Sequence, residues 1–293
     1  MLRSLMLVIN PFSGKGVSKA AIGNMVSQLC NGGYAVTVYF VGEHTPDQIA
    51  SLFAGQHELA ICVGGDGTLN GFVTGLLQSG IEIPIGFVPL GTANDVARTH
   101  AMPKKHAAAI SKIMAGTTRP LDVGRFSDRY FTYVAAFGAF TKIAYTTSRR
   151  AKRVLGHLAY ILSGVGSVAA IKARRTVIEH DAGVIEGEFV FCGVLNSTSV
   201  AGFVKLDPGR VDLADGLFEL LLVRRPIKLS DFLDIMAGVV KKTYDGDGVQ
   251  LLHTSNVKFT FEEDVAWTID GEDGGLHREV EISNCHRAID VIL

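Results

Sequence analysis

The chain has 293 residues, of which 47% are hydrophobic and 19% are charged, and its formal net charge is −1. This composition excludes a disordered chain, and the length allows two domains that each have their own core. A net charge near zero creates no positive electrostatic field that would attract a polyanion, so nucleic acid is not expected as a partner.

The cysteines, at positions 30, 62, 192 and 285, show no short paired spacing. This argues against a zinc knuckle or a disulfide framework and fits a reducing cytoplasm. No segment reaches 18 uninterrupted apolar residues, so any membrane contact is expected to be peripheral. The predicted localisation is therefore cytoplasmic, with peripheral membrane association.

Up to about residue 120, segments of strand character alternate with segments of helical periodicity. Strands are expected near residues 4–9, 35–41, 58–63 and 84–88, and helices near residues 17–30, 46–55, 68–79 and 104–115. This alternation predicts a parallel, doubly wound sheet in an α/β domain that covers residues 1–120.

The first strand ends in a small polar loop, Asn10-Pro11-Phe12-Ser13-Gly14-Lys15. Such a loop suits nucleotide phosphates, because small polar groups and an ammonium bind anions. It is not a Walker A motif, since no glycine lies five residues before Gly14 and no Ser or Thr follows Lys15. An ordinary turn with a surface lysine explains the same residues.

The third strand closes with Gly64-Gly65-Asp66-Gly67-Thr68, and a helical pattern follows from Leu69. Glycine lets backbone amides approach an anion, and the start of the helix adds a positive dipole. An acid beside polyphosphate repels it unless a cation stands between, so Asp66 implies Mg²⁺ with the nucleotide. The alternative is a turn whose residues are chosen for conformation alone.

The fourth strand runs into a second glycine loop, Pro89-Leu90-Gly91-Thr92-Ala93-Asn94-Asp95. Thr92 is a candidate phosphate contact, whereas Asn94 and Asp95 are equally well explained as caps of the helix that continues through Arg98. Two such loops at the ends of successive strands predict one shared cleft.

The pattern changes after Thr117-Thr118-Arg119-Pro120, where we place a domain boundary. Strand-like segments then dominate, at residues 121–126, 129–137, 176–180, 186–195, 217–223, 256–262 and 277–283, and helix-like segments occur near 151–171 and 229–240. These predict a second domain over residues 121–285, an antiparallel β-sandwich. The apolar tail, residues 286–293, either completes this domain or returns to the first.

The motif Asp270-Gly271-Glu272 follows the strand Val265–Ile269, which places it on a turn. Asp-Gly is also a common hairpin signal, so from chemistry alone these residues read as a turn.

Taken together, the GGDGT and PLGTANDVAR segments resemble the diacylglycerol kinase catalytic family, which includes sphingosine and ceramide kinases. The loop that begins at Asn10, the segment Leu155–Tyr160 and the Asp270-Gly271-Glu272 motif resemble further motifs of that family, so the likeness spans nearly the whole chain. GGDGT alone is shared with NAD kinases, and the likeness implies an NAD kinase/diacylglycerol kinase-like fold for the first domain.

The resemblance implies roles for particular residues. Glu272 is the expected general base for a lipid hydroxyl, with Asp66 as a second catalytic residue. The implied nucleotide contacts are Asn10, Ser13, Lys15, Thr45, Gly64, Gly65, Asp66, Gly67, Thr68, Leu69, Asn70, Thr92 and Asn94.

The segment from Leu206 to Leu217 resembles one that binds a structural Mg²⁺ in bacterial members of the family. Asp215 is the implied carboxylate ligand, and the carbonyls of Asp212 and Leu217 supply further oxygens. A turn before the next strand is the simpler explanation. The basic cluster Arg149–Arg153 is a candidate for contact with anionic lipid, or else a solvated helix flank.

The expected activity is transfer of the γ-phosphoryl of Mg-ATP to a lipid hydroxyl, most readily that of diacylglycerol, which gives phosphatidic acid. The alternatives are an NAD kinase-like enzyme and a lipid-binding or regulatory protein without turnover. Phosphatidylglycerol, a sphingoid base and a polyprenol stay open as acceptors, and the sequence leaves the oligomeric state open, a homodimer included.

Overall fold

A computed structural model describes residues 2–14, 16–91, 94–138, 172–200, 204–206 and 211–292 of the chain. Contacts between Cα atoms divide it into two compact units: unit 1 contains Met1–Val123 and His286–Leu293, and unit 2 contains Gly124–Cys285. The predicted helix at residues 151–171, the Leu155–Tyr160 motif and the basic cluster Arg149–Arg153 lie outside the described residues.

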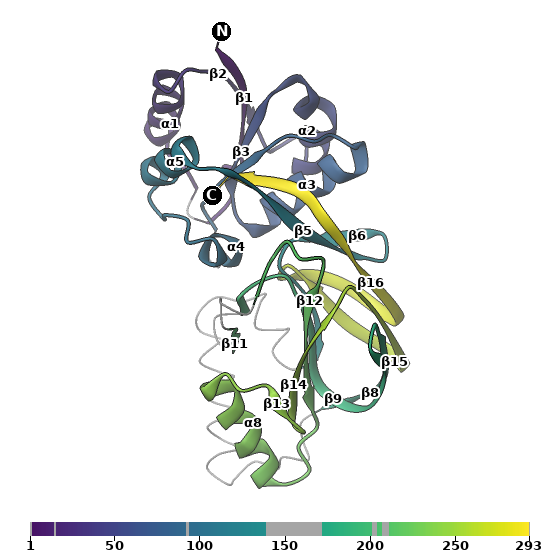
Figure 1. The fold of residues 1–293 in the computed structure, drawn as a ribbon. Helices are drawn as coiled ribbons and strands as arrows, with labels where there is room; N and C mark the ends of the chain where they lie inside the picture. Colours follow the sequence, from purple (N-terminus) through teal and green to yellow (C-terminus); the bar gives the residue numbers. More distant parts are fainter. Residues whose placement is uncertain are drawn as a thin grey trace. The chain divides into compact units, whose positions relative to one another are not determined.

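Unit 1 is built on parallel strands in the order β4-β3-β1-β2. Its elements are β1 (Arg3–Ile9), α1 (Lys19–Asn31), β2 (Tyr34–Phe40), α2 (Pro46–Phe53), the 3₁₀ helix η1 (Ala54–Gln56), β3 (Leu59–Gly64), α3 (Asp66–Ser79), β4 (Ile85–Pro89), α4 (Asp95–Thr99) and α5 (His106–Ala115). Helix α1 packs with α5 and α2 packs with α3, and Figure 1 shows the two pairs on opposite sides of the strands.

The central strands of unit 1 form its core because each contains an unbroken apolar run. Residues Leu5–Ile9 of β1 are fully buried, and so is every residue of Ala60–Val63 in β3. A run without alternation is typical of a parallel strand that is covered on both faces. Unbroken apolar runs therefore locate these strands in the sequence. The start of α1 is set by Ser18, whose Oγ accepts a hydrogen bond from the amide of Ala21 (3.2 Å).

Unit 2 is mainly antiparallel β. Its strands and helix are the later part of β5 (Thr118–Phe126), β6 (Arg129–Phe131), β7 (Val134–Gly138), β8 (Arg174–His180), β9 (Gly183–Leu195), β10 (Ser199–Val200), β11 (Val204–Lys205), β12 (Phe218–Arg224), α8 (Leu229–Lys241), β13 (Asp245–Gly246), β14 (Val249–Thr254), β15 (Asn256–Ile269) and most of β16 (Glu272–Ile292). The expectation of an α/β first part followed by a β-rich second part is confirmed.

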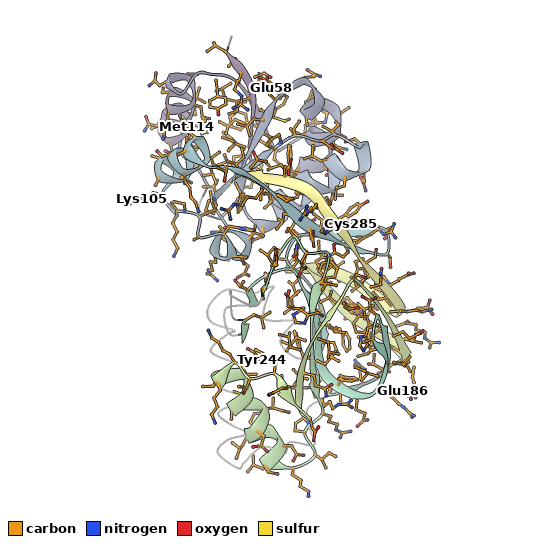
Figure 2. The ribbon with its side chains drawn as sticks, viewed as in Figure 1. Glu58, Lys105, Met114, Glu186, Tyr244 and Cys285 are labelled. Carbon is orange, nitrogen blue, oxygen red and sulfur yellow. The ribbon has the colours of Figure 1, made fainter. Side chains whose placement is uncertain are left out.

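Two long strands of unit 2, β9 and β15, each pair with both β7 and β8. Strand β9 pairs with β8 through its first half and with β7 through its second half, and β15 does the same. The pairing of β7, β9, β8 and β15 therefore closes on itself around an apolar core. Trp267 lies at the centre, with its ring 5.0 to 5.1 Å from those of Phe126, Phe137 and Phe259. Side chains as sticks fill this region in Figure 2.

Strands β15 and β16 run beyond their predicted ends. Both extend to a tight turn at Asp270 and Gly271, and β16 continues without a break into the tail that the sequence set apart. That tail belongs to unit 1, where Val291 pairs with Ile85 of β4 in a parallel register. Buried Asp122 fixes the return, because its Oδ1 accepts the amide of Arg287 (2.7 Å) and lies 3.3 Å from Nδ1 of His286.

No helix in the described part of the chain combines the length and the apolar character needed to cross a bilayer.

Candidate active site

Three loops of unit 1 follow β1, β3 and β4, and they begin at the same level of the sheet. In the parallel register Ile9 lies beside Val63, and Gly64 lies beside Pro89. Backbone hydrogen bonds continue past the strand ends, from the amide of Asn10 to the carbonyl of Val63 (2.9 Å) and from the amide of Leu90 to the carbonyl of Gly64 (2.6 Å). The carboxyl edge of the sheet therefore gathers all three loops, as parallel α/β topology requires.

The hydroxyl of Thr68 ties the first loop to helix α3. Nδ2 of Asn10 donates to Thr68 Oγ1 (2.9 Å), and Ser13 Oγ lies 3.2 Å from the same oxygen. Ser13 Oγ also accepts the amide of Gly65 (3.2 Å). Thr68 is buried and is not the helix cap, because the N-cap position of α3 is Gly65. The hydroxyl of Thr68 therefore serves in side-chain hydrogen bonds between the first loop and α3.

Glycines allow the loops to touch through their backbones. A Cβ on Gly14, which has φ +60°, would lie 2.0 Å from the carbonyl oxygen of Leu90, and a Cβ on Gly91 would lie 2.9 Å from Cα of Gly65. Gly64 is equally confined, since its Cβ would meet the side chain of Thr68 at 2.6 Å. At Gly14 and Gly91 the neighbouring loops therefore approach through backbone atoms, with no room for a side chain between them. Lys15 and Thr92, both predicted nucleotide contacts, lie outside the described residues.

The carboxylate of Asp66 spans the gap between α3 and α4. Its two oxygens accept the amides of Asp95 (3.1 Å) and Val96 (3.3 Å) at the start of α4. The pKa of Asp66 is raised to about 6, chiefly by burial and in smaller part by the charge of Asp95, although the amide hydrogen bonds lower it. Asp66 thus supplies the negative end group that a helix N-terminus favours.

Asn94 does not form the side-chain cap that the sequence left open. It occupies the N-cap position of α4 in a left-handed conformation (φ 50°) without a side-chain cap, and its Nδ2 donates to the carbonyl of Gly91 (2.5 Å). The physical reason is that Asp66 already accepts the amides of this helix. Oδ1 of Asn94 is buried and has no hydrogen-bond partner among the described residues.

The remaining predicted contacts of unit 1 lie on α2 and α3. Thr45 is the N-cap of α2, and its amide donates to Oε1 of Gln48 (3.1 Å), so a helix start accounts for it. Gly67, Leu69 and Asn70 lie in the first turns of α3, where Leu69 is buried and Asn70 is half-buried.

In unit 2, Asp270 and Gly271 form the turn between β15 and β16. Both have positive φ, 48° and 82°, and they join the paired residues Ile269 and Glu272. A two-residue hairpin loop with two positive φ values is the type I′ turn that Asp-Gly favours. Glu272 is the first residue of β16, and its side chain is exposed.

Asp270 is more than a turn residue, because its buried carboxylate organises the chain that precedes β7. Oδ2 accepts the amide (2.6 Å) and the hydroxyl (2.8 Å) of Thr132, and Oδ1 accepts the amides of Tyr133 (3.0 Å) and Val134 (2.9 Å). Burial raises the pKa of Asp270, and these hydrogen bonds act in the opposite direction. Sequence reasoning assigned this carboxylate no role, although it stands in the motif that contains Glu272.

The loop before β12 contains the predicted metal ligands of unit 2. Oδ1 of Asp212 accepts the amide of Ala214 (3.1 Å), and Oδ1 of Asp215 accepts the amide of Leu217 (2.9 Å), so both carboxylates brace the loop while staying exposed. Buried Glu219 follows on β12, and its pKa is raised to about 8, chiefly by burial and then by the charges of Asp215 and Asp212. The sequence analysis missed Glu219, whose only signal is an acid inside the apolar strand Phe218–Val223.

The donor set of this loop suits a hard cation, because it offers carboxylate and carbonyl oxygens without sulfur or imidazole. Nevertheless, no group of three or more His, Cys, Asp or Glu side chains in the described part of the chain is arranged to hold a metal. A cation there would depend on backbone oxygens and water as well as on Asp215.

Comparisons with known proteins give a consistent result. The sequence model of the diacylglycerol kinase catalytic domain matches residues 4–126. A diacylglycerol kinase of Staphylococcus aureus strain JH9 is 31% identical over 99% of this chain and 92% of its own length, and one of Bacillus subtilis strain 168 is 29% identical over 98% and 95%.

Solved structures agree at the level of the fold. A diacylglycerol kinase structure from Bacillus anthracis strain Sterne aligns with a TM-score of 0.76 at 20% identity, covering 99% of this chain and 96% of that one. Another structure from the same organism gives a TM-score of 0.81 at 23% identity, covering 99% and 95%.

Proposed function

The chain belongs to the diacylglycerol kinase family, and from this premise we propose that it transfers the γ-phosphoryl group of ATP to the hydroxyl of diacylglycerol, which gives phosphatidic acid and ADP. The observation that carries the proposal is the meeting of the three glycine-containing loops at the carboxyl edge of β1, β3 and β4, through Thr68 and through the backbone contacts of Gly14 and Gly91. Edges of this kind bind nucleotides in α/β sheets.

Each unit has its own part in this proposal. Unit 1 is the nucleotide-binding domain, a doubly wound sheet that corresponds to the predicted domain 1–120 with the returning tail 286–293. Unit 2 is the lipid-substrate domain, an antiparallel β-sandwich that corresponds to residues 121–285. The lipid is met at a membrane surface, and a cytoplasmic enzyme with peripheral membrane contact is the arrangement that this substrate requires.

The residues of the three loops fit a nucleotide. The close backbone contacts of Gly14 and Gly91 keep side chains out of the space between the loops, and Asp66, Gly67 and Thr68 form the first turn of the 14-residue helix α3, whose dipole favours an anion. The buried Oδ1 of Asn94, which lacks a partner in the described part of the chain, is an acceptor suited to a ribose hydroxyl or an adenine amino group. Lys15 and Thr92 complete the proposed set.

Asp66 is the residue in this set that suits Mg²⁺. Each carboxylate oxygen accepts one amide of α4, which leaves further lone pairs for a cation. Mg²⁺, when bound, neutralises charge that develops on the transferred phosphoryl group. We place a second, structural Mg²⁺ at Asp215 with the carbonyls of Asp212 and Leu217, because that loop offers oxygen donors alone.

Glu272 is the proposed general base. The acceptor hydroxyl oxygen forms a bond to the γ-phosphorus, the bond from that phosphorus to the leaving oxygen of ADP breaks, and the hydroxyl proton passes to Glu272. Glu272 suits this task because it is exposed and stands beside a turn that Asp270 holds in place.

Thr68→Val is expected to raise KM for ATP about tenfold with little change in kcat. The substitution keeps the shape of the side chain but leaves Asn10 and Ser13 without their shared partner, a loss of about 1–2 kcal/mol in ordering the loop. Steady-state kinetics with varied ATP measures the change. Thr74→Val, on the same helix, is the matched control; an equal KM for both variants would contradict the role of the Thr68 hydroxyl.

The titration of Asp66 predicts a pH dependence of stability. A carboxyl pKa that is raised to about 6 means that the folded protein holds this proton more tightly than the unfolded chain does. The contribution of Asp66 to the free energy of unfolding therefore falls by about 3 kcal/mol as pH rises from about 4 to about 6, and it is level above pH 6.

Urea unfolding across this pH range compares the wild type with Asp66→Asn. The difference between them should change with pH only in that window, whereas Asp290→Asn, at an exposed aspartate of β16, should follow the wild type throughout. A parallel pH profile for wild type and Asp66→Asn would show that the Asp66 pKa is not raised.

The proposed activity is tested by incubating the protein with γ-labelled ATP, Mg²⁺ and mixed micelles that each contain diacylglycerol, sphingosine, ceramide or phosphatidylglycerol. NAD is the soluble comparison. Label in diacylglycerol supports the proposal, label in another lipid changes the acceptor, and label in NAD alone overturns lipid phosphorylation.

A further inference from the structure

Helix α8 of unit 2 has two apolar faces, and within the described part of the chain one of them packs against the sheet. Phe232 and Ile235 are buried, and α8 packs against β14. Ile235 also lies against Gly248, where a Cβ would stand only 2.7 Å from its Cγ1. Figure 1 shows α8 near β13 and β14. The inner face therefore fixes the helix to the sheet.

The outer face carries an apolar stripe in contact with solvent. Leu229, Leu233 and Val240 recur at the spacing of one helix face, and Ile227 stands just before the helix. Their exposed fractions are 45%, 46%, 77% and 82%, and they make up four of the ten exposed large hydrophobic residues in the described part of the chain. The other six are scattered among β-strands, loops and α2, so this concentration marks a contact surface.

Lysines flank the stripe at both ends. Lys228 precedes the helix and Lys241 and Lys242 end it; all three are exposed, and none has an ion pair within the described ranges. Acids share this region: Oδ2 of Asp231 accepts the amides of Ile227 (3.0 Å) and Lys228 (2.9 Å), and its charge attracts that of Lys228, while Asp245 and Asp247 beyond the helix are exposed. Exposed Asp234 is the remaining acid of the helix.

Lys242 occupies the C-cap of α8, a position that usually holds glycine. It has φ 58° in the left-handed conformation that ends α8, and glycine ordinarily occupies such a position. The chain thus carries a cation at the cost of conformational strain.

From these observations we infer that α8 is a membrane-docking helix that lies in the interface of a bilayer containing anionic lipids. The apolar stripe enters the boundary of the acyl chains, and the lysines at both ends meet anionic head groups. A second copy of this chain fits the surface poorly, because antiparallel pairing of two α8 helices would bring lysine against lysine. The inference rests on the proposed function, since a diacylglycerol acceptor resides in a bilayer.

Vesicle cosedimentation tests the inference with the full chain. The probes are vesicles of phosphatidylcholine alone and of phosphatidylcholine with phosphatidylglycerol in equal parts. The wild type should bind the anionic vesicles and release them as salt is raised, because salt screens exposed charges. Leu233→Ser with Val240→Ser replaces two exposed residues of the stripe without touching the core. Lys241→Gln with Lys242→Gly removes two charges and places glycine at the left-handed helix end.

Each double variant should lower the partition coefficient on anionic vesicles by about tenfold or more. Two controls match them. Val184→Ser changes an exposed apolar residue of β9, and Lys104→Gln with Lys105→Gln changes an adjacent exposed lysine pair of unit 1, where Figure 2 labels Lys105. Both controls should bind as the wild type does.

Activity on a short-chain diacylglycerol dispersed in detergent separates docking from catalysis, and the α8 variants should retain it. Loss of vesicle binding in the α8 variants alone supports the inference, even if no acceptor is phosphorylated and the proposed function fails. The inference is wrong if the α8 variants bind anionic vesicles as the wild type does. It is also wrong if the wild type does not bind anionic vesicles. A change of oligomeric state in the α8 variants, measured by sedimentation, overturns it in favour of a second copy.

Discussion

Glu272→Gln is expected to lower kcat for lipid phosphorylation by about three orders of magnitude, because a positioned general base contributes about 10²–10⁴-fold. The amide keeps the size of the side chain but accepts no proton from the acceptor hydroxyl at neutral pH. Since the side chain is exposed, the variant should fold as the wild type does. Transfer of label from γ-labelled ATP to diacylglycerol measures the loss, and KM for ATP should stay within about twofold, because the residue does not belong to the nucleotide loops of unit 1.

Glu281→Gln is the matched control, since it removes an exposed carboxylate from the same strand. It should retain wild-type kcat. If Glu272→Gln kept more than about a tenth of the wild-type kcat, general base catalysis by this residue would be excluded, since the loss would fall below the range for such a group.

Asp270→Ala is expected to cost about 4 kcal/mol of stability and to abolish activity. The substitution leaves the amides of Thr132, Tyr133 and Val134 and the hydroxyl of Thr132 without their acceptor inside the protein, and each unsatisfied buried donor costs about 1–3 kcal/mol. The turn that carries Glu272 would lose its fixed position at the same time. Urea unfolding and the labelled-ATP assay measure the two effects on the same sample.

Two comparisons make this result specific. Asp273→Ala removes an exposed carboxylate that accepts one amide, that of Gly275 (2.9 Å), and should cost less than about 1 kcal/mol. Asp270→Asn retains one acceptor oxygen and should fall between alanine and the wild type. Equal stability of Asp270→Ala and Asp273→Ala would show that the buried hydrogen bonds of Asp270 contribute nothing net.

The strands and helices of unit 1 were accessible from the sequence because local rules decide them. Unbroken apolar runs located β1, β3 and β4, and Ser18 and Pro46 stand at helix starts, where such residues are favoured. Unit 2 was harder. Strand β14 went unpredicted, because Val249–Thr254 is short and shows no alternation, and its place is fixed by pairing with β12. The full length of β15 and β16 likewise depends on their pairing with each other.

The site was predictable as far as single loops are concerned. The glycine motifs and the Asp270-Gly271 turn lie where the sequence placed them, at strand ends. The sequence could not show which distant groups form hydrogen bonds in the folded protein. Asp66 accepts amides 29 and 30 residues further along, and Asp270 accepts donors that lie 136 to 138 residues earlier. Such partners depend on the register of distant strands. The side-chain cap that the sequence left open for Asn94 does not form, because the distant carboxylate of Asp66 accepts the amides at the start of α4.

The return of residues 286–292 to unit 1 sets an order of events during synthesis. A ribosome releases the chain from its N-terminus, so β4 emerges long before the segment that pairs with it through Val291 and Ile85. The earlier segment must wait with an open sheet edge while all of Gly124–Cys285 is made. The pairing of Val291 with Ile85 therefore forms only after Gly124–Cys285 has been made, and an incomplete chain that stops before residue 286 lacks this partner for β4.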